Sequence, residues 1–162
     1  MAGIEARLAE LGITLPHRSP APAGTYVPAV LSDNLVFTAG QLPFVDGALP
    51  VTGKVGAAVS ADDARECART AALNALSAVA EVVGSLDRVV RIVKVVGFVA
   101  SDPGFTAQPG VVDGASTVLG AIFGDAGVHA RSAVGVAVLP LDSPVEIELI
   151  VEVSPPLTPK EN

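Results

Sequence analysis

Residues 145–153 alternate between apolar and polar side chains more regularly than any other part of the chain. Glu146, Glu148 and Glu152 stand between the apolar positions. Successive side chains of a β-strand point to opposite faces of its sheet, so a period of two predicts a strand with one face in the core. The apolar positions are Val145, Ile147, Leu149, Val151 and Val153. The rest of the chain must therefore supply elements that cover one face of a sheet.

Two longer stretches have the period of a helix and can provide that cover. The first is residues 61–83, which follow Ser60 and precede Gly84. The Ser60 hydroxyl can cap a free backbone amide while Asp63 reaches back, and glycine commonly follows a helix end. The second helix runs from residue 108 or 110 to residue 123, with apolar residues at helical spacing.

The remaining apolar runs are short. Ser32, Asp33 and Asn34 are typical turn residues and predict a hairpin between the first two strands. We expect strands at 26–30, 35–40, 89–99 and 131–139, a further edge strand within 53–59, and an amphipathic helix at 2–11. The order β-β-(β)-α-β-α-β-β predicts one α+β domain over residues 1–162, with a five- to six-stranded sheet and two long helices on one face.

The ends of the chain and the second face of the sheet carry further expectations. Residues 1–21 are interpreted as an N-terminal helix and linker, and residues 154–162 as a flexible tail. Placing both long helices on one face leaves the other face bare. Half of the residues are apolar, and the predicted strands are among the apolar segments. An obligate interface resembles a core cut in half, so we expect a partner subunit on the bare face.

Charge and composition argue against several classes of function. The net charge of −7 disfavours nucleic acid and anionic membrane surfaces, since both attract clustered Lys and Arg. The most apolar run, residues 89–100, contains Arg91 and Lys94 and is too short to cross a bilayer. Charges in the first ten positions do not fit a signal peptide, and the single cysteine, Cys67, can form no internal disulfide. We therefore expect a cytoplasmic protein without nucleic-acid or membrane partners.

Candidate metal ligands and nucleophiles are sparse. His17 and His129 are far apart in the sequence, and Cys67 lies within an apolar helix. Metal sites usually show short ligand spacings, which this sequence lacks. A thiol in apolar surroundings is usually inert. We expect neither a metal ion nor a cysteine nucleophile.

Arg131 is the charged residue whose placement most needs explanation. It enters a predicted strand from a glycine-containing loop and precedes an almost unbroken apolar run. A guanidinium at the mouth of an apolar sheet needs an anionic partner. That partner is either a strand glutamate in a structural ion pair or a substrate carboxylate held by two parallel N–H bonds. The glutamates at 146, 148 and 152 are also ambiguous: they form a solvated face, or one of them positions water.

Two separated motifs carry the most specific signal in the sequence. The C-terminal motif is Arg131-Ser132, an apolar stretch, Leu139-Pro140, a loop and Val145-Glu146-Ile147-Glu148. The N-terminal motif is Tyr26-Val27 followed by Phe37-Thr38-Ala39-Gly40-Gln41-Leu42-Pro43. Over residues 22–153 the chain resembles the RidA/YjgF family of reactive-intermediate deaminases. Segments 113–116 and 129–135 resemble a longer, divergent branch of that family.

The resemblance implies a chorismate-mutase-like α+β fold with a mixed sheet, assembled as a homotrimer with clefts between subunits. It implies cofactor-free hydrolysis of enamines and imines, such as 2-aminoacrylate, to a 2-keto acid and ammonia. Position by position, Arg131 matches the arginine that binds the substrate carboxylate, and Glu146 matches the glutamate that orients water. Tyr26 matches a tyrosine lining the cleft, and Gly40 matches a glycine whose backbone approaches the substrate.

Three substrate-binding positions depart from the active deaminases. Ala39 replaces a serine, Gly114 an asparagine and Ala133 a cysteine. Losing the first two polar side chains should give a larger or less polar pocket. Ala133 keeps a backbone carbonyl that can hold the attacking water with Glu146. The departures favour an alternative function, a non-catalytic trimer that binds small carboxylates, whereas the acidic balance disfavours a ribonuclease.

Overall fold

The computed structural model describes residues 3–17, 19–22 and 24–155. Five strands form one sheet in the order β1-β2-β5-β3-β4. Strands β3 and β4 run parallel, and all other neighbours are antiparallel. The strands are β1 (Ala29–Ser32), β2 (Leu35–Thr38), β3 (Val89–Ala100), β4 (Ala130–Val136) and β5 (Val145–Val153). The sheet is therefore mixed, as the resemblance implied, and its last strand has the predicted bounds.

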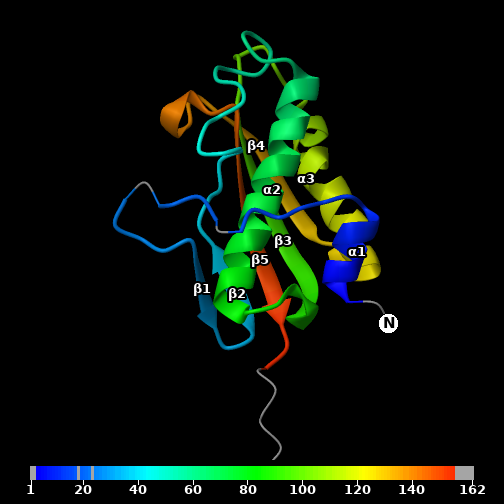
Figure 1. The fold of residues 1–162 in the computed structure, drawn as a ribbon. Helices are drawn as coiled ribbons and strands as arrows, with labels where there is room; N and C mark the ends of the chain where they lie inside the picture. The colour runs from blue at the N-terminus through cyan, green and yellow to red at the C-terminus, as the bar shows by residue number, and fades with distance from the viewer. Residues whose placement is uncertain (1–2, 18, 23, 156–162) are drawn as a thin grey trace, which may run out of the picture.

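Two long helices pack on one face of this sheet (Figure 1). They are α2 (Ala61–Val83) and α3 (Gln108–Phe123), and a short α1 (Ile4–Glu10) packs beside α3. The Ser60 hydroxyl accepts a hydrogen bond from the Asp63 amide at 3.0 Å and donates to the Asp63 carboxylate at 2.7 Å. Gly84 ends α2 in the left-handed conformation. The predicted α+β fold with two helices on one face is confirmed.

The alternation in β5 sorts its side chains between the two faces. Every odd position from Val145 to Val153 is buried under the helices, and every even position is partly exposed. Close approach of α3 depends on two glycines. A Cβ at Gly97 would lie 2.4 Å from the Val112 side chain, and a Cβ at Gly114 would lie 1.9 Å from the Arg65 carbonyl oxygen. These contacts seat α3 against both β3 and α2.

The opposite face of the sheet carries apolar side chains that no described element of this chain covers. Val30, Phe37 and Val134 are 50%, 39% and 44% exposed. By register, Phe37 pairs with Ile150, and Phe98 pairs with both Glu146 and Val134, so these side chains share that face. Exposed apolar clusters of this kind typically mark an interaction surface.

Some expected elements differ in the structure. Residues 53–59 form isolated bridges rather than a strand, since Gly53 and Gly56 have φ of 112° and 90° and interrupt extended backbone. The strand expected at 131–139 ends at Val136, and residues 140–142 form a 3-10 turn. Most of the tail expected at 154–162 lies outside the described residues. No helix in the described part of the chain is long and apolar enough to cross a membrane.

Candidate functional site

Three of the predicted site residues line one cavity. Tyr26, Gly40 and Glu146 surround a space of about 200 Å³. The start of β5 lies beside the segment after β2 because Gln41 and Ile147 exchange backbone hydrogen bonds of 2.8 and 3.0 Å. The other lining residues are Pro20, Ala21, Pro22, Pro28, Gln41, Leu42, Phe44, Pro140 and Leu141. The cavity is mostly apolar, with one carboxyl group in its wall.

Gly40 and Glu146 lie in direct contact in this cavity. A Cβ at position 40 would lie 1.7 Å from Glu146 Oε1 and 2.6 Å from its Cδ. No side chain fits at position 40 while the carboxyl group keeps its place. The glycine is therefore required for the observed position of Glu146.

Burial raises the pKa of the Glu146 carboxyl above its usual value, and the negative charge of Glu148 adds to the shift. Desolvation and a like charge both disfavour the ionised form of a carboxyl group. A carboxyl group with a raised pKa can hold a proton closer to neutral pH and donate it to a leaving group. The electrostatics thus suit Glu146 to proton transfer.

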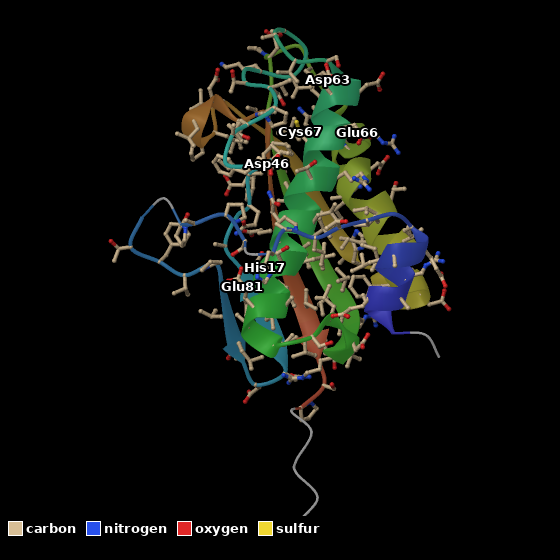
Figure 2. All side chains as sticks on the ribbon, in the orientation of Figure 1. His17, Asp46, Asp63, Glu66, Cys67 and Glu81 are labelled. Carbon is tan, nitrogen blue, oxygen red and sulfur yellow. The ribbon has the colours of Figure 1, made fainter. Side chains whose placement is uncertain are left out.

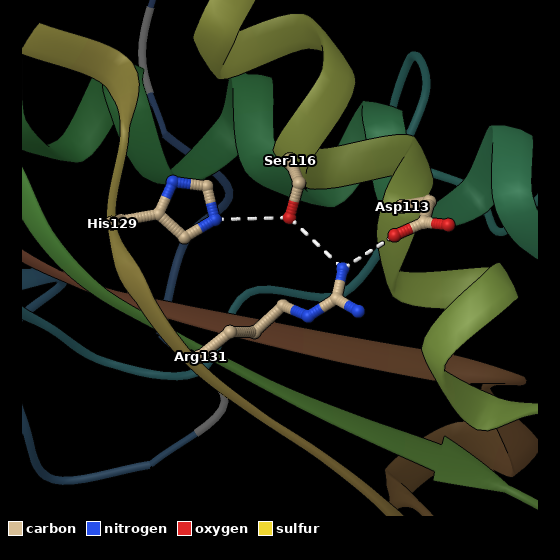
Figure 3. Close-up of polar contacts among 4 residues, drawn as sticks. All are labelled: Asp113, Ser116, His129 and Arg131. Carbon is tan, nitrogen blue, oxygen red and sulfur yellow. Dashed lines mark hydrogen bonds and ion pairs between the residues drawn. The ribbon is translucent and has the colours of Figure 1, made fainter. Parts of the chain in front are cut away.

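Arg131 lies elsewhere, on the edge strand β4, and points toward α3 (Figure 3). Its Nη1 donates to Asp113 Oδ1 at 2.7 Å and to Ser116 Oγ at 3.1 Å. His129 continues the network, with Nε2 at 2.9 Å from Ser116 Oγ and Nδ1 at 2.6 Å from the Gly127 carbonyl oxygen. The Arg131 side chain remains 23% exposed and the Asp113 side chain 47% exposed.

The ion pair differs from the one considered on sequence grounds. Arg131 pairs with an aspartate of α3 rather than with a glutamate of β5, because the two strands present these charges on opposite faces. Val95, buried under the helices, is the register partner of Arg131, whereas Phe98 on the bare face is the partner of Glu146. Strand β3 also separates β4 from β5. Within one chain the guanidinium and the Glu146 carboxyl group cannot face one ligand.

Comparison with known proteins identifies the family. Residues 5–153 match the family described as "YjgF/chorismate_mutase-like, putative endoribonuclease". The chain belongs to the YjgF family. Protein TCP17 of Trypanosoma cruzi is 42% identical over 152 residues, which cover 93% of this chain and 94% of TCP17.

Several solved structures are similar to this YjgF-family chain in both fold and sequence. The protein Atu1372 from Agrobacterium tumefaciens, of unknown function, is 43% identical with a TM-score of 0.86, covering 93% of this chain and 92% of that one. The structure of E. coli TdcF with bound serine is 27% identical with a TM-score of 0.62, covering 86% of this chain and 96% of TdcF.

The remaining predicted positions lie at different places in the fold. Ala39 precedes Gly40, and its amide donates to the Pro28 carbonyl at 2.8 Å. Ala133 lies on β4 in register with Gly97, on the same face as Arg131. Gly114 is buried against α2, where close helix packing explains the absence of a side chain. The structure thus brings Tyr26 and Gly40 to one cavity with Glu146, leaves Ala39 adjacent to Gly40 in the chain, and leaves the other positions with Arg131 or within the core.

Asp113, Ser116 and His129 were not assigned a role from the sequence. The signal was present: residues three apart on a helix lie on one face, as do residues two apart on a strand. Asp113 and Ser116 are three residues apart on α3. His129 and Arg131 are two residues apart, His129 directly before β4 and Arg131 within it. Their meeting depends on how α3 crosses β4, which the two spacings do not specify.

The cysteine and the histidines show no arrangement for metal binding in the part of the chain that the structure describes. Cys67 is buried in α2, and Asp63 and Glu66 flank it on the same helix (Figure 2). Burial raises the pKa of the Cys67 thiol to about 11, and the charges of Asp63 and Glu66 add to the shift. A thiol held in the protonated form is a poor nucleophile, as expected from its sequence context.

Proposed function

We propose that this YjgF-family protein hydrolyses small 2-imino and enamine acids to 2-keto acids and ammonia, in clefts between the subunits of a homotrimer. The observation that carries the proposal is that one chain holds the two predicted catalytic residues in separate places. Arg131 and Glu146 occupy opposite faces of one sheet, and each faces away from the other. A second copy of the chain can bring Arg131 of one subunit to Glu146 of its neighbour.

The bare sheet face supports this assembly. Its apolar side chains, including Phe37 and Val134, are exposed in the isolated chain and would be covered by a second copy. A head-to-tail contact that closes into a ring uses two different surfaces of each subunit, so it repeats the same composite cleft at every interface. The bound serine in TdcF supports a small amino or imino acid as ligand.

Hydrolysis of an imine requires little more than correct placement of the substrate and of a water molecule. Arg131 binds the carboxylate and orients the imine carbon. Glu146, with the backbone carbonyl of Ala133 from the neighbouring subunit, holds a water that attacks this carbon. As the C–O bond forms, Glu146 takes a proton from the water and passes it to the nitrogen. The second proton of the water follows the same route as the C–N bond breaks, so that ammonia leaves and a keto group remains. No step draws on a metal ion or an organic cofactor. The single cysteine, Cys67, can form no internal disulfide, which supports a cytoplasmic location.

The test uses two inactive variants in one assembly. Arg131→Ala should lose carboxylate binding, and Glu146→Gln should bind but turn over slowly. When the two variants are co-expressed with different tags and purified as hybrids, each mixed trimer should contain both intact residues in one of its clefts, about a third of the total, because a closed ring joins the two kinds of subunit once in each order. Ammonia release from imines generated in situ should then reappear. Hybrids that remain inactive would exclude a site shared between subunits.

A second function is favoured by one observation. Ala39 precedes Gly40, which lines the cavity, and offers no hydroxyl group to a ligand, so the site can bind a carboxylate without turning it over. Binding of serine or pyruvate without ammonia release from any imine would identify a small-carboxylate binding protein instead of a deaminase.

A further inference from the structure

A groove in the helix layer lies apart from the cavity of Glu146. It encloses about 350 Å³ between α2, α3 and the segment that follows α1. No residue that lines this groove also lines the cavity of Glu146, and Arg131 does not border it. The groove is therefore a second hollow, built from helices rather than from the edge of the sheet.

Two arginines line this groove without an anionic partner. Arg65 and Arg69 are four residues apart on α2, so they lie on one helix face. Within the described part of the chain neither side chain makes an ion pair or a hydrogen bond, even though Glu66 lines the same groove. Like charges at this spacing repel each other, in a chain whose net charge is −7. A bound anion would relieve that repulsion.

Close packing of the two helices places the Arg65 stem against α3. A Cβ at Gly114 would lie 1.9 Å from the Arg65 carbonyl oxygen and 3.1 Å from Arg65 Cγ. The side chain of Arg65 therefore starts at the junction of α2 and α3. Arg69 follows one turn later on α2 and is half-buried. Both arginines thus border the same hollow from the α2 side.

The facing wall of the groove is mostly apolar. Leu11 and Ile13 follow α1, and Val118 lies on α3 one turn after Gly114. Ile13 and Val118 belong to the buried core, and Leu11 packs against it. Binding sites commonly combine such an apolar wall with a few polar groups that orient the ligand. Two cationic groups beside an apolar wall are complementary to a molecule with one anionic end and an apolar body.

We propose that the groove between α2 and α3 binds small carboxylates that carry an apolar body. The carboxylate accepts hydrogen bonds from Arg65 and Arg69, and the apolar body packs against Leu11, Ile13 and Val118. This second site goes beyond the proposed deamination and does not depend on it. The negative charge of Glu66, at the same groove, opposes the ligand and limits its affinity.

The test compares three ligands. Phenylacetate has both the charge and the apolar body, phenylacetamide lacks the charge, and acetate lacks the ring. Dissociation constants for the full-length protein are measured by calorimetry, or by ligand-observed NMR for weak binding. Two exposed ion pairs should give phenylacetate an advantage of about tenfold over the amide. Partial burial of the ring should give about tenfold over acetate. Added salt should reduce only the first advantage, because it screens charges.

Matched variants separate charge from shape. The double variant Arg65→Gln, Arg69→Gln should weaken phenylacetate about tenfold and leave phenylacetamide unchanged. Glu66→Gln should have the opposite effect and strengthen phenylacetate about threefold, a gain that damage to the fold would not produce. Arg91→Gln removes an exposed arginine of β3 that does not line the groove, and should change neither constant.

Arg131→Ala distinguishes this groove from the proposed substrate site. Phenylacetate binding that persists in Arg131→Ala and is weakened in the double variant supports the groove. Binding that Arg131→Ala abolishes, or that the double variant leaves unchanged, overturns the inference. So do equal constants for phenylacetate and phenylacetamide in the unmodified protein, a result that needs no variant to fold. Ammonia release from imines is measured separately and tests the proposed function alone.

Discussion

Replacing Gly40 with alanine should displace the Glu146 carboxyl group and leave the fold intact. The new Cβ would lie 1.7 Å from Oε1 and 2.9 Å from Cγ of Glu146. Non-bonded atoms stay about 3.5 Å apart, so the carboxyl oxygen must move by about 2 Å. The atoms in conflict belong to the end of a flexible side chain, which can turn away. An off-rotamer side chain costs about 1 kcal/mol, so we expect only a modest loss of stability.

The effect on catalysis should be larger than the effect on stability. Displacing a catalytic group by about 1 Å can lower a rate about 100-fold, and we expect a loss of that order in kcat. KM should change little, because Arg131, the proposed ligand of the substrate carboxylate, is untouched. The assay is ammonia release from imines generated in situ, with thermal unfolding measured in parallel. Gly110→Ala is the matched control, since a Cβ there meets nothing within 4 Å. A folded Gly40→Ala variant with unchanged kcat would show that the position of Glu146 does not matter.

Three further predictions concern stability and reactivity. Because burial and Glu148 raise the pKa of Glu146, the folded state favours its protonated form, and the stability this gives is lost as pH rises through the raised pKa. Glu146→Gln should therefore unfold at a higher temperature than the parent at pH 8, and the gain should disappear near pH 4; a gain that grows on acidification would contradict the sign. Ser60→Ala removes the α2 cap and should cost about 1 kcal/mol in urea unfolding, whereas an unchanged midpoint would show that the cap is dispensable. With its pKa near 11, Cys67 should react with a thiol reagent only after unfolding, and rapid labelling of the native protein at pH 7.5 would refute its burial.

Elements with a strong local signal were predictable from the sequence. The alternation at 145–153 predicted β5 to the residue, and Ser60 and Gly84 marked both ends of α2. Residues 53–59 were harder, because their apolar pattern suits a strand while two glycines with positive φ do not. Local pattern specifies an element only where backbone geometry agrees with it.

The sequence indicated candidate site residues but not which of them the fold brings together. The sequence indicated Arg131 and an anionic partner, and offered the glutamates of β5 as one choice. The partner in the structure is Asp113, brought over β4 by an α3 that packs closely at Gly97 and Gly114. That contact depends on tertiary packing between segments far apart in the chain, which no spacing within either segment encodes. The opposite-face placement of Arg131 and Glu146 likewise follows only from the register of β3 with its two neighbours.

The separation of Arg131 from Glu146 by strand β3 has a consequence for how such a protein responds to its own abundance. A lone subunit holds only half of the proposed site, so dilution below the dissociation constant of the assembly would inactivate every copy without altering any residue. Specific activity would then rise with protein concentration until association is complete, and the cell could regulate turnover through the amount of protein it makes.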